Sequence, residues 1–281
     1  MAARRLAAAL LAALVVAGCA ATATSPSMVV GARSDAQSTL LANLYAAALR
    51  SYGTAARVES MPDPLTGLDS GDVTVAPGFT GTLLNTFAPG SKARSATQVY
   101  RDMVSALPEG VAAGDFAEAA EDKPALAVTD ATADAWRGRD VTAAVRRCDD
   151  LVVGQLAEAR RPASVGTCTL DVRRFPNAAK LFQALRTGQI NAAWTSTADP
   201  AIPADAVVLT DRTALIRAEN VVPLYRRNEL SEMQALALNE VAGVLDTAGL
   251  VAMRRQVDAG GDPARVADGF LAEHPLGATS R

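Results

Sequence analysis

The stretch that decides the fold is MVVGARSDAQSTLLANLYAAALRSYG, residues 28–53. Its first part, 29–32, is apolar and predicts a buried strand. Ser34-Asp35-Ala36-Gln37 then has the form of a capping box, and apolar residues recur at helical spacing up to Gly53, which predicts a long helix that ends at a glycine. A strand that leads directly into a helix is the unit from which α/β proteins are built.

The same alternation continues along the chain. Short apolar runs predict strands at 55–59, 72–76, 125–129, 149–154, 190–195 and 206–210, with helices at 95–107 and 177–186. This order indicates parallel sheets with crossover connections. Residues 229–273 carry no strand signal and predict three helical segments, broken near Gly249 and 260–263, that pack on an earlier sheet.

Composition limits the chemistry. The chain has 281 residues, 29.0 kDa, 49% apolar and 4% aromatic residues, and a charge of 27 − 30 = −3, which disfavours nucleic acid as a partner. Its one histidine, His274, and three cysteines supply neither a Ser/His/Asp or Cys/His catalytic set nor a zinc set. We therefore predict a protein that is not an enzyme and needs no cofactor or metal, and a secreted enzyme remains a minor alternative.

The N-terminal segment is typical of export. Two arginines precede an uncharged run at 6–17, which is too short to span a membrane as a helix. The run ends in LVVAGC, 14–19, which resembles the bacterial lipobox, and the resemblance implies that Cys19 receives diacylglycerol. We expect a lipoprotein signal peptide at 1–18, a tether at 19–27 and a lipid anchor on the extracytoplasmic face of the cell membrane. The alternative is a plain signal peptide with an incidental cysteine.

Export also favours a disulfide between Cys148 and Cys168, the remaining cysteines. Closing a loop of about 20 residues contributes on the order of 3 kcal/mol in the loop-entropy model. The alternative is a pair of separate buried thiols.

Ligands of open α/β sheets bind at the carboxyl ends of strands, so four loops are candidates for ligand contact: 31–34, 77–82, 121–124 and 194–199. Each could equally be an ordinary capped loop. The acidic group Glu118, Glu121 and Asp122 is interpreted as a solvated face. The paired arginines, 254–255 among them, are interpreted as surface charge.

In order and spacing, several motifs resemble one family, the solute-binding proteins of ABC importers for glycine betaine, choline and related osmoprotectants. The resemblance extends from residue 28 to about 275. It rests on VVGAR (29–33), PGFTGT (77–82), 100–107, ALAV (125–128), FQALRTGQINAA (182–193), NVVP (220–223), QVD (256–258) and PARVADGFL (263–271).

The resemblance implies a two-lobe, type II-like periplasmic-binding-protein fold that closes on ligand like a venus flytrap, with the C-terminal helices packed on the first lobe. Lobe 1 would comprise 28–123 and 220–281, and lobe 2 would comprise 124–219. It also implies an ABC permease and ATPase as partners.

The same resemblance assigns a ligand site. Arg33, Thr82 and Arg161 match the groups that bind the ligand carboxylate, and Thr80 and Asn220 belong to the matching motifs. Phe79 keeps one ring of an aromatic cage for a quaternary ammonium. The other three walls are missing, because Pro124, Ser196 (with Trp194 two residues earlier) and Glu219 stand in their places, while the acid Asp122 is kept.

We therefore expect a small polar or zwitterionic solute whose cationic end meets Asp122 or Glu219, rather than glycine betaine itself. The alternative is a degenerate homologue that acts as a surface sensor or interaction lipoprotein without import.

Overall fold

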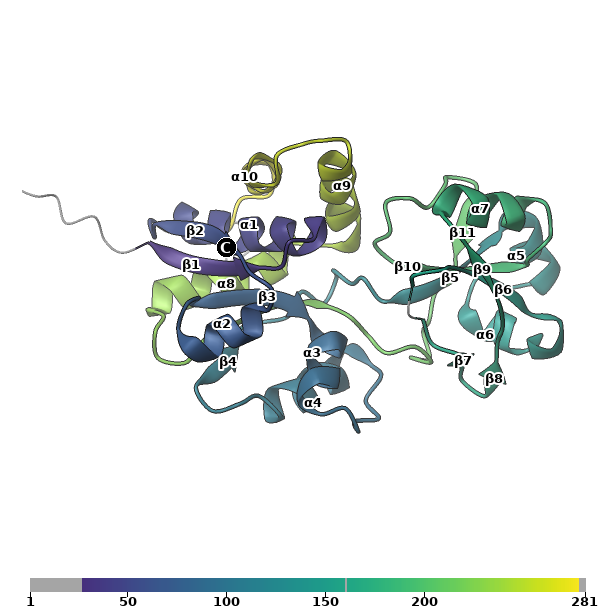
Figure 1. Ribbon diagram of the computed structural model, residues 1–281, viewed down its shortest axis with the longest axis horizontal. Coiled ribbons are helices and arrows are strands. Elements are labelled where there is room, and N and C mark those ends of the chain that lie inside the picture. Colours follow the sequence, from purple (N-terminus) through teal and green to yellow (C-terminus); the bar gives the residue numbers. More distant parts are fainter. Residues whose placement is uncertain (1–26, 160, 278–281) are drawn as a thin grey trace, which may run out of the picture.

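The 28–53 stretch forms strand β1 (Met28–Ala32) and helix α1 (Ala36–Ser51) in a computed structural model that describes residues 27–159 and 161–277 (Figure 1). Asp35 caps the helix, because its carboxylate accepts the backbone N–H of Ser38 at 2.8 Å. The chain turns after the helix at Gly53, whose φ is +78°. Most of α1 from Leu40 to Leu49 is buried, so this helix lies at the centre of the first lobe.

Lobe 1 is built on a five-stranded sheet with the order β2-β1-β3-β12-β4. Its other strands are β2 (Ala56–Ser60), β3 (Val75–Phe79), β4 (Val111–Ala113) and β12 (Val221–Arg226). One face packs against α1, α8 (Glu232–Val244), α9 (Thr247–Asp258) and α10 (Pro263–Glu273). The other face packs against α2 (Pro64–Ser70), α3 (Thr80–Phe87) and α4 (Ala96–Ser105). The C-terminal helices thus pack on lobe 1, as predicted.

Lobe 2 is built on a second sheet, β11-β5-β10-β6-β9. Its strands are β5 (Pro124–Thr129), β6 (Val152–Leu156), β9 (Asp171–Phe175), β10 (Ala192–Ser196) and β11 (Ala206–Val208). Helices α5 (Asp130–Trp136) and α6 (Val141–Val145) share a core on one face, and α7 (Ala178–Arg186) packs on the other. The two-lobe α/β class is confirmed.

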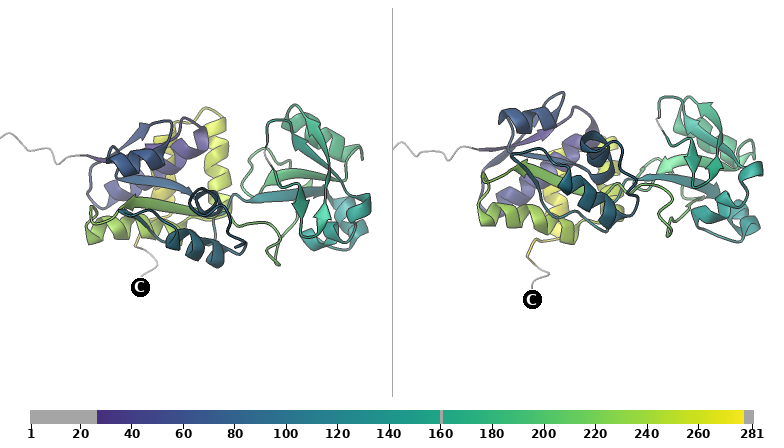
Figure 2. Two further views of the ribbon diagram at one scale, coloured as in Figure 1. Left: turned by 60° about the horizontal axis from the view of Figure 1, so that its bottom comes forward. Right: turned by 90° about the horizontal axis from the view of Figure 1, so that it is seen from below.

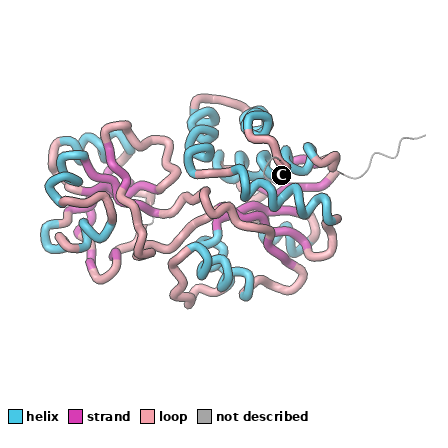
Figure 3. Tube along the Cα trace, turned by 180° about the vertical axis from the view of Figure 1, so that it is seen from behind, coloured by secondary structure: helices cyan, strands magenta, loops and turns pink. Residues whose placement is uncertain are grey.

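The prediction of parallel sheets holds for the pairing of β1 with β2 and β3 and of β6 with β9 and β10, but it is wrong for the remaining pairs of the two sheets. Strand β12, which returns from lobe 2, runs antiparallel to β3 and β4, and β5, which enters lobe 2, runs antiparallel to β10 and β11. Both strands continue a segment that crosses between the lobes, so each enters its sheet from the side that faces the other lobe. Figures 2 and 3 show the two crossing segments side by side from other directions.

Several element boundaries also differ from prediction, and the strand expected at 72–76 lies at Val75–Phe79. The strand expected at 149–154 is preceded by a 3₁₀ turn, Cys148–Asp150, and begins only at Val152. The break expected near Gly249 lies before residue 247, because Asp246 caps α9 by accepting the N–H of Gly249 at 2.7 Å. That glycine is therefore inside the first turn of α9.

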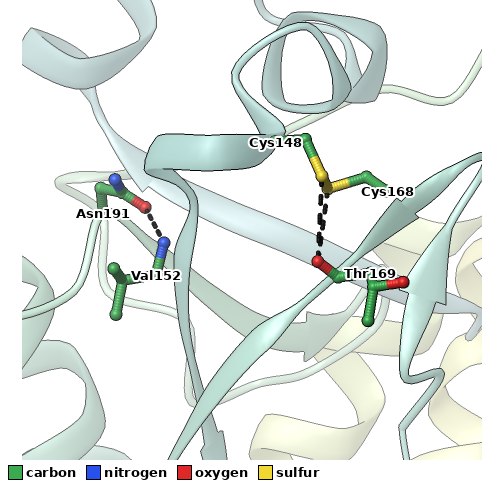
Figure 4. The surroundings of a disulfide bond; sticks show 5 residues. All are labelled: Cys148, Val152, Cys168, Thr169 and Asn191. Carbon is green, nitrogen blue, oxygen red and sulfur yellow. Dashed lines mark hydrogen bonds between the residues drawn. A yellow bond between two sulfur atoms is a disulfide. The ribbon is translucent and has the colours of Figure 1, made fainter.

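The disulfide between Cys148 and Cys168 is confirmed, with a Cα–Cα distance of 5.4 Å. It joins the 3₁₀ turn to the hairpin of β7 (Ser164–Val165) and β8 (Cys168–Thr169), and both sulfur atoms lie beside the carbonyl oxygen of Thr169 (Figure 4). Asn191 holds the same region from the other side, because its side-chain oxygen accepts the N–H of Val152 at 2.9 Å. The disulfide thus fixes the hairpin to the core of lobe 2.

Within residues 27–159 and 161–277, no single helix is long and apolar enough to cross a membrane. The pair α8 and α9 reaches that length and composition together, but it is bent by 97°. The predicted signal peptide, the predicted lipidation site at Cys19 and nearly all of the expected tether lie outside the described residues.

Candidate ligand-binding site

The two segments that join the lobes are hydrogen-bonded to each other; we call residues 120–124 and 218–221 the crossing pair. The N–H of Asp122 donates to the carbonyl of Glu219 at 2.9 Å, and the N–H of Val221 donates to that of Ala120 at 3.1 Å. Two paired backbones resist shear but allow bending, so they can serve as a hinge between the lobes.

Helix α3 begins directly against this hinge. The N–H of Thr80 donates to the carbonyl of Asn220 at 2.9 Å, and the N–H of Asn220 donates to the Thr80 hydroxyl at 3.0 Å. The Asn220 amide also donates to the carbonyl of Ala117 at 3.1 Å. Thr80 and Asn220, both expected at the ligand site, are buried and hold the hinge onto lobe 1.

A cleft of about 760 Å³ opens between the lobes beside the crossing pair. We call it the interlobe cleft. Lobe 1 contributes Gly81, Thr82, Asn85, Thr86, Pro89, Ser91, Lys92 and Arg94. The crossing pair contributes Pro124 and Glu219, and the side of lobe 2 contributes Pro162, Ser164, Leu215, Ile216 and Arg217. Its volume is in the range of small-molecule sites.

A smaller pocket of about 100 Å³ lies within lobe 1, on the other side of α3. Arg33 and Phe79 line this pocket, and Thr82 and Thr86 line both it and the interlobe cleft. Arg33 is exposed, with its Nε 3.5 Å from the Asp35 carboxylate. Arg33 and Phe79 therefore lie together, but they do not line the larger cleft.

Glu219 lies between the hinge and the start of α3. Its carboxylate accepts the backbone N–H of Thr82 at 2.8 Å and the Thr82 hydroxyl at 3.0 Å. Burial raises the pKa of the Glu219 carboxyl, and hydrogen bonds from Thr82 and Gly81 offset part of that rise. The Thr82 donors, expected to bind a ligand carboxylate, are thus occupied by a side chain of this protein.

Asp122 lies on the other segment of the crossing pair and is held from three sides. Its carboxylate accepts from the Gln37 amide at 2.6 Å, from Arg254 at 3.1 Å and from the backbone N–H of Ala198 at 3.2 Å. Arg254 also donates to the carbonyl of Ala198 at 2.7 Å. The side chains of Asp122 and Arg254 are only 12% and 20% exposed, so this contact joins α1, α9 and the end of β10 across the lobes.

The interpretation of Glu121 and Asp122 as a solvated face is therefore wrong, and so is that of Arg254 as surface charge. The Nζ atom of Lys123 lies 3.6 Å from the carboxylate of Glu121 and 3.8 Å from the buried carboxylate of Asp211. Burial raises the pKa of the Glu121 carboxyl, while the nearby Lys123 charge lowers it. The pattern of charges along the chain does not reveal the partnership of Asp122 with Arg254 or of Lys123 with Asp211, because these pairs join segments distant in sequence.

Arg161 is half-buried in lobe 2, and its Nε has no hydrogen-bond partner among the described residues. Burial lowers the pKa of its guanidinium, and the charges of Asp122 and Asp199 oppose this. Arg161 lines a polar recess with Gln155 and Arg174, separate from the interlobe cleft.

The rings of a cation cage are not gathered here. Phe79 is the one aromatic residue lining the two pockets within the described part of the chain. Trp194, considered as a substitute for the ring at Ser196, is buried in the core of lobe 2, and Ser196 itself is 6% exposed. No group of three His, Cys, Asp or Glu residues in the described ranges could hold a metal ion.

Comparison with known proteins agrees with this architecture. The family model described as the substrate-binding domain of the ABC-type glycine betaine transport system, OpuAC, matches residues 26–154 and 174–273. The chain is thus a substrate-binding protein of an ABC transporter, a class whose members are not enzymes. It belongs to the OpuAC family.

Solved structures of low identity share the fold. Apo YehZ from Escherichia coli is 20% identical, with a TM-score of 0.72 over 89% of this chain and 99% of that one. A glycine betaine/carnitine/choline ABC transporter protein is 17% identical, with a TM-score of 0.73 over 88% and 98%. Lactococcal OpuAC in complex with glycine betaine is 10% identical, with a TM-score of 0.51 over 88% and 96%. No curated protein sequence matches the chain.

Proposed function

We propose that this protein is the extracytoplasmic receptor of an ABC import system and binds a small polar or zwitterionic solute between its lobes. The observation that carries the proposal is the interlobe cleft of about 760 Å³, which residues of both lobes line at a hydrogen-bonded hinge. Closure of two lobes around a bound solute is a recurring mechanism on such an architecture.

Charges of both signs favour a zwitterion or another highly polar solute over an apolar one. Lys92, Arg94 and Arg217 line the cleft together with Glu219. Polar groups that converge on a pocket fix the orientation of a ligand and provide its specificity.

We further propose that glycine betaine is not the preferred solute. A trimethylammonium group offers no hydrogen to donate and is best held by several ring faces. Here Phe79 alone of the lining residues in the described ranges offers such a face, and it lies in the small pocket.

The proposed setting is the cell membrane, with a lipid on Cys19 as the anchor and a permease and an ATPase as the partners. The LVVAGC run at 14–19 supports the anchor, and family membership supports the transporter partners. Metabolic labelling with a fatty-acid analogue, compared between the wild type and Cys19→Ala, tests the anchor.

A thermal-shift panel of solutes, followed by titration calorimetry, tests the binding function. A ligand at 100 times its Kd stabilises the folded state by about 2.7 kcal/mol, which such a screen detects readily. Tight binding of glycine betaine that Phe79→Ala leaves unchanged would contradict the proposal that betaine is not preferred.

A second candidate is a sensor or interaction lipoprotein that no longer imports. The observation that favours it is the use of the Thr82 donors by Glu219, which removes one expected ligand contact. Uptake of a bound solute by cells, lost on deletion of this gene, would distinguish import from sensing.

A further inference from the structure

The start of α3 presents a set of donors that suits an anion, and the chain fills it with its own carboxylate. The Thr82 N–H and hydroxyl donate to the two oxygens of Glu219 at 2.8 and 3.0 Å, and the N–H of Gly81 also donates to it. Backbone N–H groups at the first turn of a helix attract negative charge. This position is therefore occupied before any solute arrives.

The contact between Glu219 and the start of α3 requires a glycine at position 81. A methyl group on this residue would lie 2.9 Å from the Glu219 carboxylate and would overlap the carbonyl oxygen of Ala218. Any side chain at Gly81 would separate α3 from the crossing pair. The sequence thus keeps the space that lets Glu219 reach its donors.

The Glu219 charge is not neutralised by a neighbouring cation. Within the described ranges, no Lys, Arg or His nitrogen lies within 4 Å of its carboxylate, and the charge that most affects it is the negative one of Asp122. Arg94 and Arg217 line the same cleft, but they donate to backbone carbonyls of Leu215, Ser91 and Ala93.

Glu219 also keeps some capacity to accept hydrogen bonds. An ionised carboxylate has about four acceptor positions, and the donors from Thr82 and Gly81 use three of them. The residue lines the interlobe cleft. Of the two acids considered for the cationic end of a solute, Glu219 is the one with unpaired charge, because Asp122 is bonded to Arg254.

We propose that Glu219 sets the charge selectivity of the cleft: it binds the ammonium or guanidinium group of the solute and keeps carboxylates away from the start of α3. This rests on the proposed function. It names the ligand class as small organic cations or zwitterions that carry N–H donors. A zwitterion would enter with its cationic end toward α3, opposite to the orientation that the Thr82 match implies.

The first test needs no natural solute. Glu219→Ala removes the carboxylate and leaves the Thr82 and Gly81 donors, so acetate should raise the melting temperature of this variant. Acetate should leave unchanged the wild type and the control Glu109→Ala, which alters an exposed acid on another surface. The proposal is overturned if acetate stabilises the wild type equally, or if Glu219→Ala does not respond.

The second test compares solutes with and without N–H donors. Calorimetry compares ethanolamine, putrescine, agmatine and γ-aminobutyrate, which carry N–H donors, with choline and glycine betaine, which do not. The four solutes with N–H donors should bind the wild type more tightly. Their affinity should fall by about tenfold or more in Glu219→Gln and stay unchanged in Glu109→Gln. Tighter binding of choline or glycine betaine, or an unchanged affinity in Glu219→Gln, would overturn the proposal.

The two tests separate the ways in which the argument can fail. If none of the six solutes binds, the result counts against the proposed function. The acetate response still decides whether Glu219 occupies an anion site.

Discussion

The crossing pair carries Asp122 on one segment and Glu219 on the other, and these two acids are held in opposite ways. Asp122 is bonded to Arg254, Gln37 and the backbone of Ala198, which come from both lobes. Glu219 is bonded to the start of α3 and has no ion pair among the described residues.

The difference shows that the partners of an acid, more than its place in the chain, decide its role. Asp122 has its charge compensated and joins the lobes, so its removal should affect stability. Glu219 faces the interlobe cleft with its charge unpaired, so its removal should affect what the cleft binds.

The largest effect is expected for Asp122→Ala. It leaves the mostly buried Arg254 without its counter-ion, and we expect a loss of about 3 kcal/mol in the free energy of unfolding, measured with urea. Asp268→Ala, which breaks the exposed Arg50 pair, should cost at most about 1 kcal/mol. Equal losses in the two variants would show that Asp122 does not join the lobes as described.

The next largest effect is expected for Gly81→Ala. It should lower the free energy of unfolding by about 2 kcal/mol, because the added methyl group would overlap the carbonyl oxygen of Ala218. Gly269→Ala is the matched control, since a methyl group there meets no atom within 4 Å and alanine favours a helix. Urea unfolding compares the two. A neutral Gly81→Ala would mean that α3 and the crossing pair tolerate separation.

Glu219→Gln should change stability by no more than about 1 kcal/mol, because no ion pair is lost and the amide oxygen can still accept the Thr82 N–H. The same urea measurement applies. A loss as large as that of Asp122→Ala would remove the distinction between the two acids.

The smallest expected effect is a dependence on pH of the contribution that Glu219 makes to the free energy of unfolding. Burial raises the pKa of the Glu219 carboxyl above its ordinary value of 4.5, so the folded state holds this proton more tightly than the unfolded state. The contribution of this group to stability should therefore fall as pH rises from about 4.5 through the raised pKa. The difference in unfolding free energy between wild type and Glu219→Gln should show this decline, and a difference that rises with pH would contradict it.

Much of the fold could be predicted from the sequence. Local patterns reveal β1, α1, α7 and the C-terminal helices, because their caps and apolar spacing lie within a few residues of one another. Strand direction could not be predicted in this way. Whether β12 runs parallel or antiparallel to β3 depends on a chain path that leaves lobe 1 and returns to it.

The contacts of the candidate site could not be predicted from the sequence. The motifs place Thr82 and Glu219 among the expected ligand contacts, yet nothing in the sequence indicates that they bind each other. Arg254 was missed because its partner, Asp122, is distant in the chain. Such pairs are fixed by tertiary packing, and no local pattern encodes them.

The position of β12 has a consequence for the order of folding. This strand lies between β3 and β4, and the chain reaches it only after all of lobe 2 has been passed. Lobe 2 is continuous in sequence, so we expect it to collapse first and to shorten the effective loop that the lobe 1 sheet must close. Lobe 1, although it begins the chain, would then be the last to complete its sheet, and a nascent chain that ends before β12 would expose the open edge of β3.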